Sequence, residues 1–168
     1  MKTRRVWQII LGLATILWIA FIFANSAKSG VESGADSSSV TEWLNETVGH
    51  VIPSFHVSGF FIRKAAHFLE FALLSVLLSF DLTLLFSLRA ADTVKRSSLV
   101  LLAIPVSATV AMIDEIIQRF SPGRGPSVRD VLIDTSGAAT AALLFFGILC
   151  LMLWKRRKRK NLALYKSN

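Results

Sequence analysis

The sequence predicts an all-α integral membrane protein, a four-transmembrane-helix bundle with a short amphipathic helix in its first outer loop. Two observations support this class: 53% of the 168 residues are apolar, and they gather in four long segments. Each segment approaches or exceeds the ~20 residues that a helix needs to cross a bilayer. The mean hydropathy of +0.55 also excludes an ordinary soluble domain.

We expect one domain over residues 1–154, built from four helices at about 6–24, 64–88, 98–118 and 130–154. Unpaired backbone groups are costly in lipid and the alternating pattern of barrel strands is absent, so these segments should be helices. The first helix follows a basic start, as a secretory signal does, but it ends in large apolar residues instead of a small-residue cleavage site. We therefore expect an uncleaved anchor.

Basic residues outside the apolar segments predict the topology. They precede the first helix, separate the second from the third and follow the fourth: Lys2, Arg4 and Arg5; Arg89, Lys95 and Arg96; and residues 155–160. By the positive-inside rule these regions are cytoplasmic, so both termini of a multi-pass protein of the bacterial cytoplasmic membrane lie inside.

The net charge of +8 does not indicate a nucleic-acid partner, because no aromatic residues are interleaved with the basic run. We expect the tail, residues 155–168, to lie in the cytoplasm against anionic lipid headgroups. Cys150 is the only cysteine, which excludes an intramolecular disulfide. The sequence does not predict the oligomeric state.

The first outer loop begins with small polar residues that we expect to be mobile. An amphipathic helix should begin at Ser39, with Glu42 completing a capping box, and continue until Pro53. With Trp43 facing inward, this helix could cover a polar cluster as a lid. It could equally be a surface helix that fills the space between helix ends.

The second outer loop carries Arg119, Arg124 and Arg129. Three arginines on an outer loop run against the positive-inside trend, and arginine binds phosphate and carboxylate in a bidentate manner. Alternatively, these arginines pair with neighbouring acidic residues and lipid headgroups. Ser127 should cap the fourth helix, with Asp130 in its first turn.

Ionisable and amide side chains occur near the same ends of three predicted membrane helices. They are Arg63, Lys64, His67 and Glu70; Asp114, Glu115 and Gln118; and Arg124, Asp130 and Asp134. A charge at the bilayer centre costs at least ~2.5 to 3.5 kcal/mol, so such a cluster usually marks a functional site. Arg63, His67 and Glu70 are spaced to share one helix face.

Residues of these types support three alternatives. Histidine side chains ordinarily have a pKa near neutrality, so His67 could act as general acid or base beside the carboxylates. His67 with Glu70, Glu115, Asp114 or Asp134 could instead hold a divalent cation. The third alternative is a neutralised network that only locks the helices together. The residues alone do not decide whether the protein is an enzyme or which metal, if any, it binds.

The motifs RKAAHFLEFALL and IDEIIQRFSPGRGPSVRDVLIDTSGA resemble the VanZ-like family, which is named for a teicoplanin-resistance protein. The matching positions are Lys64, His67, Glu70 and Phe71; Asp114, Glu115, Gln118, Phe120, Pro122 and Arg124; and Ser127, Asp130, Val131, Asp134 and Gly137. The polar run FANSAKSG after the first helix is also similar. Asp134 stands where the family more often has Asn, which adds a negative charge.

This resemblance implies a role in the bacterial cell envelope and reduced susceptibility to glycopeptide antibiotics of the teicoplanin type. Combined with the cluster, it predicts a pocket in the outer leaflet that binds, and could modify, an anionic molecule such as a lipid-linked cell-wall precursor. The partners would then be membrane lipid and this precursor or a glycopeptide. The alternative is a non-enzymatic scaffold whose polar cluster is structural.

We assign expected roles on this basis. The catalytic residues of an enzyme would be His67, Glu70, Glu115 and Asp134. Substrate binding would fall to the remaining members of the cluster: Arg63, Lys64, Asp114, Gln118, Arg124, Ser127 and Asp130. A small permease is disfavoured because few polar residues continue toward the inner side.

Overall fold

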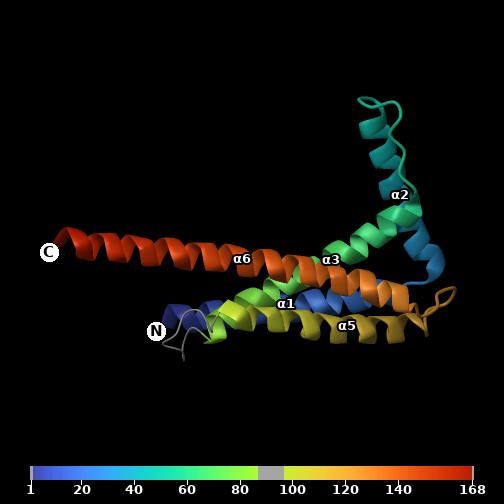
Figure 1. Ribbon diagram of the computed structural model, residues 1–168. Helices are drawn as coiled ribbons and strands as arrows, with labels where there is room; N and C mark the ends of the chain where they lie inside the picture. The colour runs from blue at the N-terminus through green and yellow to red at the C-terminus, as the bar shows by residue number, and fades with distance from the viewer. Residues whose placement is uncertain (1, 87–96, 168) are drawn as a thin grey trace.

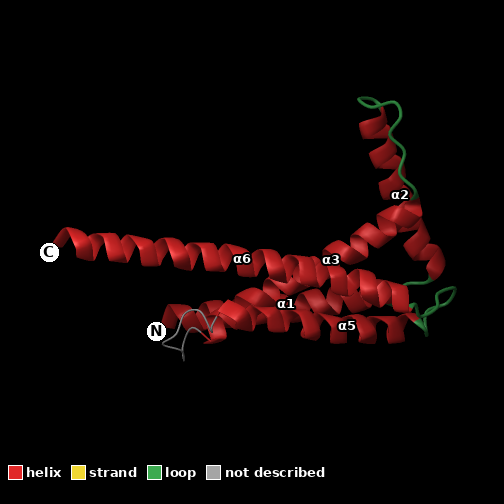
Figure 2. Cartoon of the chain, in the orientation of Figure 1, coloured by secondary structure: helices red, strands yellow, loops and turns green. Residues whose placement is uncertain are grey.

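The computed structural model describes residues 2–86 and 97–167, and all regular structure in these ranges is helical (Figure 2). The elements are α1 (Lys2–Ser26), α2 (Gly30–Gly49), α3 (Gly59–Phe86), the 3-10 helix η1 (Leu99–Leu102), α5 (Ala103–Gln118) and α6 (Val128–Ser167). Within the described residues, four stretches are long and apolar enough to cross a membrane: Thr3–Ser26, Gly59–Phe86, Leu99–Gln118 and Val128–Arg156. The predicted four-helix membrane class is confirmed.

The helix α3 is central in the bundle, because it packs against α1, α2, α5 and α6. Both chain termini lie at one end of the bundle (Figure 1). The opposite end is formed by the C-terminal ends of α1 and α5 and the N-terminal ends of α3 and α6; we call it the loop end. The short segments 27–29 and 119–127 lie there, and α2 projects away from it.

A small apolar core lies where the four helices meet, next to the loop end. Its members are Ile22, Phe71, Leu74, Val110, Ala111 and Ala138. Small residues on α5 and α6 let the helix backbones approach closely, as is common in membrane bundles. Large apolar side chains on the outer faces, such as Leu17 and Leu144, are exposed in the isolated chain and suit contact with lipid.

The helix α2 begins earlier than the sequence suggested. Its N-cap is Ser29, whose hydroxyl accepts a hydrogen bond from the backbone N–H of Glu32, while the Glu32 side chain accepts from the backbone N–H of Ser29. The predicted start at Ser39 is wrong: its hydroxyl donates back to the carbonyl of Ala35 inside the helix. A complete capping box starts the helix ahead of the small residues, which then continue it.

The expected inward orientation of Trp43 is also wrong. Its side chain is 63% exposed, and α2 has no buried residue. The C-terminal half of α2 stands clear of the bundle (Figure 1). Only the N-terminal half of α2 lies near the polar cluster, where it lines a cavity described below.

Two helices differ in length from the expected ranges. The helix expected to begin near residue 64 starts at Gly59, and the one expected to end near residue 154 continues as α6 to Ser167. The basic run 155–160 is therefore part of one long helix. Arg89, Lys95, Arg96 and the last two residues of the helix expected to end at residue 88 lie outside the described residues.

Candidate functional site

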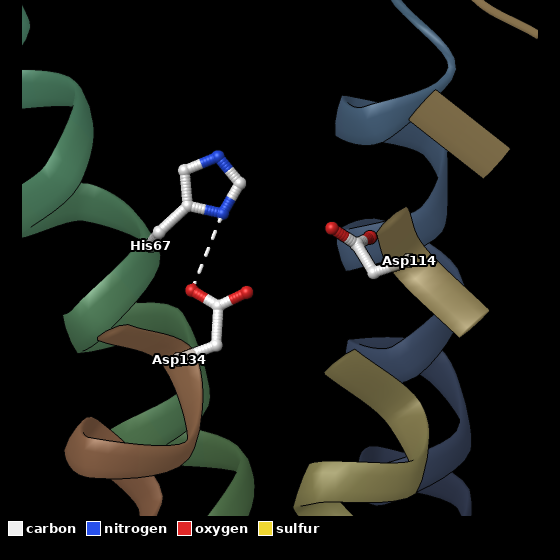
Figure 3. A group of neighbouring side chains, drawn as sticks. All are labelled: His67, Asp114 and Asp134. Carbon is white, nitrogen blue, oxygen red and sulfur yellow. Dashed lines mark ion pairs between the residues drawn. The ribbon is translucent and has the colours of Figure 1, made fainter. Parts of the chain in front are cut away.

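Three side chains from three different helices converge at the loop end. His67 comes from α3, Asp114 from α5 and Asp134 from α6, and one potential ligand atom of each lies within 4.8 Å of the others. Figure 3 shows Asp114 facing His67 and Asp134 across the space between the helices. His67 Nδ1 lies 3.6 Å from Asp134 Oδ1. These residues are adjacent only because the helices pack, since the chain separates them widely.

A glycine makes this convergence sterically feasible. Gly137 lies one helical turn after Asp134, and a Cβ at this position would overlap the backbone carbonyl oxygen of Phe68. The absent side chain lets α6 approach the backbone of α3 directly. His67 precedes Phe68, so this approach also places the imidazole beside the Asp134 carboxylate.

The three side chains are enclosed, yet several of their polar atoms have no partner. Asp114 and Asp134 are fully buried, and the side chain of His67 is 12% exposed. Among the described residues, no hydrogen-bond partner reaches either oxygen of Asp134, Oδ1 of Asp114 or Nδ1 of His67. Burying polar groups without partners costs free energy, so this arrangement calls for an explanation beyond packing.

Gln118 holds the other oxygen of Asp114. Its Nε2 donates to Asp114 Oδ2 at 2.9 Å and reaches Ser26 Oγ at 3.3 Å. Asp114 and Gln118 are four residues apart on α5, so one helix face brings them together. Gln118 therefore orients the Asp114 carboxylate with its free oxygen toward His67 and Asp134.

The other two carboxylates of the cluster contact different elements. Glu115 Oε2 accepts a hydrogen bond at 2.6 Å from the backbone N–H of Ser127, immediately before α6. Glu70 Oε1 accepts one at 3.0 Å from the Asn25 side chain near the end of α1. The Glu115 contact suits a carboxylate at a helix N-terminus, where it satisfies a free N–H and the helix dipole.

Two basic residues of the cluster are engaged within the fold. Lys64 forms an ion pair with Asp130 that joins α3 to the first turn of α6. The Arg124 guanidinium donates to the carbonyls of Asn25 and Ser26, at 3.3 and 3.1 Å, and to Ser33 Oγ at 2.9 Å. Arg124 thus ties the 119–127 segment to the junction of α1 and α2.

Arg63 differs from these residues. Within residues 2–86 and 97–167, it has no hydrogen-bond or salt-bridge partner, and it lines a cavity together with Arg124. Burial, followed by the positive charge of Arg63, lowers the pKa of the Arg124 guanidinium. The two like charges are therefore close enough to repel each other.

This cavity has a volume of about 200 Å³ and opens between the end of α1, the first half of α2 and the start of α3. We call it the loop-end cavity. Three basic residues line it (Lys28, Arg63 and Arg124), together with the acidic Asp36 and Glu70 and with His67. Lys28 and Asp36 pair with each other at 2.9 Å, so the unpaired positive charge of Arg63 remains.

The expected site residues therefore separate into three groups. Arg63, His67, Glu70 and Arg124 line the cavity; Asp114 and Asp134 lie against His67; and Lys64, Glu115, Gln118, Ser127 and Asp130 contact the helices that hold these residues. The cavity also includes residues outside the expected set, namely Asn25, Ser26, Lys28, Ser33 and Asp36. The polar run after the first helix was the available sequence signal for them.

Comparison with known proteins places the chain in a family. The family model described as VanZ/LLP1 matches residues 11–155, which contain all four candidate membrane spans except the outermost residues of the first and the last. No curated protein matches the chain. No solved structure matches it. Since the family model covers most of the chain, this multi-pass membrane protein belongs to the VanZ/LLP1 family.

Proposed function

We propose that the loop-end cavity binds an anionic molecule of the bacterial cell envelope, such as a lipid-linked cell-wall precursor, from the outer leaflet of the cytoplasmic membrane. The observation that carries this proposal is Arg63, a cation without a partner among the described residues that lines a cavity beside a second guanidinium. Phosphate or carboxylate between Arg63 and Arg124 would relieve their repulsion. Arginine also offers the planar donor pair that fits such groups.

The proposed outward orientation of the cavity is supported by the position of the basic ends. Arg4 and Arg5 lie near the start of α1, and Lys155 lies late in α6. Both chain termini lie at the same end of the bundle (Figure 1). The loop-end cavity lies at the opposite end. By the positive-inside rule, the basic end faces the cytoplasm.

The same geometry allows a reaction at the bound molecule. His67 lines the cavity and has Asp134 next to its ring. This pair has the residue types of a general acid or base and the carboxylate that orients it. Glu70, also on α3, contributes a carboxylate to the lining of the same cavity. Binding without turnover uses Arg63 and Arg124 alone.

The resemblance to a family named for a teicoplanin-resistance protein supports a proposal about antibiotic susceptibility. A protein that holds or alters a lipid-linked precursor changes what a glycopeptide can reach at the membrane surface. We therefore propose that expression of the chain lowers susceptibility to antibiotics of the teicoplanin type. This cellular effect would follow from the cavity and would not require direct contact with the antibiotic.

A structural role for the polar cluster is the second candidate, and two specific contacts favour it. The Lys64–Asp130 ion pair joins α3 to α6, and the Glu115–Ser127 hydrogen bond joins α5 to the segment immediately before α6. These contacts involve residues other than those that line the cavity, so both roles can be present in one molecule.

Binding to the full-length protein in lipid nanodiscs tests the proposal. The probes are a polyprenyl pyrophosphate and the corresponding uncharged polyprenol. We expect the charged lipid to bind more tightly, and Arg63→Gln to weaken its binding by about tenfold, since an unpaired guanidinium that meets phosphate contributes on the order of 1.4 kcal/mol or more. Arg129→Gln makes the same charge change at an exposed position outside the cavity.

The control should bind as the wild type does. Equal affinity for the charged and uncharged lipids would exclude anion recognition. An Arg63→Gln protein with unchanged affinity for the charged lipid would exclude this cavity as the anion-binding site.

A further inference from the structure

We infer that His67, Asp114 and Asp134 form a binding site for one divalent transition-metal ion, of the Mn²⁺ or Zn²⁺ kind, in the wall of the loop-end cavity. The three donors come from α3, α5 and α6 and lie within 4.8 Å of one another. The inference goes beyond anion binding, because the donor set exists whether or not an anion enters the cavity.

The distances suit a single ion. Two ligands that each lie about 2.0–2.1 Å from a tetrahedral ion are separated by roughly 3.4 Å. The His67–Asp134 separation of 3.6 Å is close to this value. The third donor completes a triangle with sides no longer than 4.8 Å, so the ion needs only a small inward movement of Asp114.

Unpartnered atoms provide independent support. Both oxygens of Asp134 are fully buried and lack a hydrogen-bond partner among the described residues, as do Oδ1 of Asp114 and Nδ1 of His67. A proton shared between His67 and Asp134 would satisfy only two of these four atoms. A metal ion takes a ligand atom from each of the three residues, including Oδ1 of Asp114.

Charge leads to the same conclusion. When both buried carboxylates are ionised they add two negative charges between the membrane helices, and a divalent cation cancels both. Two neighbouring cations are engaged elsewhere: Lys64 pairs with Asp130, and Arg124 donates to the carbonyls of Asn25 and Ser26. Within the described chain, the His67 ring makes the only ion-pair contact with Asp134.

The chemical types of the three donor atoms restrict which metal ion fits the site. Imidazole suits Zn²⁺ and other transition metals, whereas carboxylates suit Mn²⁺ and harder ions, so one imidazole with two carboxylates favours Mn²⁺ or Zn²⁺. The Gln118 side chain donates a hydrogen bond to Asp114 Oδ2 at 2.9 Å, which fixes the orientation of this carboxylate as a ligand. His67 also lines the cavity, which places the ion where it could meet an anionic ligand.

Mn²⁺ binding to the full-length protein in detergent, after treatment with a chelator, tests this inference without any lipid probe. Electron paramagnetic resonance should show that a single Mn²⁺ binds per chain. Asp134→Asn and Asp114→Asn should each weaken this binding by at least about tenfold, since even second-shell changes cost 10- to 100-fold. Asp81→Asn is the matched control: Asp81 is another carboxylate on a membrane helix, and it accepts a hydrogen bond from Thr15.

A second measurement on the wild-type fold keeps the inference testable if a variant misfolds. Pulsed electron paramagnetic resonance should detect one imidazole nitrogen coupled to the bound Mn²⁺. The chain has three histidines, so the coupling should persist in a His50→Asn, His56→Asn double variant and disappear in His67→Gln.

Absence of stoichiometric Mn²⁺ binding, affinity that Asp134→Asn leaves unchanged, or a bound ion without nitrogen coupling would each overturn the inference. These outcomes would leave the anion-binding proposal standing. Conversely, loss of lipid binding in Arg63→Gln with Mn²⁺ affinity intact would separate the two sites.

Discussion

Gly137 of α6 lies so close to the backbone carbonyl of Phe68 in α3 that no side chain fits between the two helices. This contact sets the separation of α3 and α6 at the level of His67 and Asp134. The polar cluster therefore depends on a residue that carries no polar atom in its side chain.

The first prediction concerns this helix contact. Gly137→Ala should force α6 away from α3 and lower the stability of the protein by about 1–3 kcal/mol, as overpacking does. Thermal unfolding of the full-length protein in detergent measures the effect. Gly147→Ala is the matched control on the same helix, because a Cβ there meets no atom within 4 Å.

The control should be neutral or stabilising, since alanine favours a helix by up to ~1 kcal/mol over glycine. Equal melting temperatures for Gly137→Ala and wild type would contradict the close approach.

The length and apolar content of four segments were sufficient to predict the four-helix class, and the motifs were sufficient to predict the family. Spacing along one helix also predicted that Arg63, His67 and Glu70 share a face, and all three line the loop-end cavity. The start of α2 was missed because two separate residue pairs, Ser29 with Glu32 and Ser39 with Glu42, fit the same capping pattern. Sequence alone does not decide which of them begins the helix.

Contacts between helices could not be predicted, because the sequence does not specify how helices rotate against each other. The selection of Asp114 and Asp134, rather than Glu70 and Glu115, to lie with His67 depends on this rotation. The same holds for Lys64 with Asp130 and for the unpartnered Arg63. The roles assigned to these residues in binding and catalysis stay predictions.

The second prediction concerns the Lys64–Asp130 ion pair, whose side chains are 16% and 14% exposed. Lys64→Met and Asp130→Asn should each destabilise the protein, because each leaves a poorly solvated charge without its partner. The double variant should lose less than the sum of the single losses, with a coupling of about 0.5–3 kcal/mol. Additive losses in a double-mutant cycle would show that the two side chains do not interact.

The third prediction concerns topology. In a Cys150→Ser background, a membrane-impermeant maleimide added to intact cells or spheroplasts should label Ser39→Cys on α2 and Arg129→Cys at the start of α6. Thr3→Cys at the other end of the bundle should react only after the membrane is opened. All three positions are exposed in the structure. Protection of Arg129→Cys from outside would place the cavity on the cytoplasmic side.

The fourth prediction separates positioning from function by comparing two cluster residues. Glu115→Gln should lower the melting temperature, because the carboxylate that accepts the Ser127 N–H loses its charge, and a hydrogen bond to a charged group contributes ~1.5–3 kcal/mol. His67→Ala removes only the 3.6 Å contact with Asp134 and no hydrogen bond of Nδ1 among the described residues, so this variant should remain folded.

Teicoplanin susceptibility of cells that express each variant at matched levels completes this comparison. Wild-type protein should lower susceptibility and His67→Ala should not. A His67→Ala protein that protects cells fully would remove His67 from the functional site, and a Glu115→Gln protein of unchanged stability would refute its positioning role.

We propose that the cluster at the loop end binds a ligand and does not only stabilise the packing of the helices. The most direct test is an experimental structure of the full-length protein purified together with its native lipids. We expect an anionic headgroup in the loop-end cavity that contacts Arg63 and lies beside His67. A cavity closed by a salt bridge between Arg63 and Glu70, with the lipids bound only along the outer faces of the helices, would contradict it.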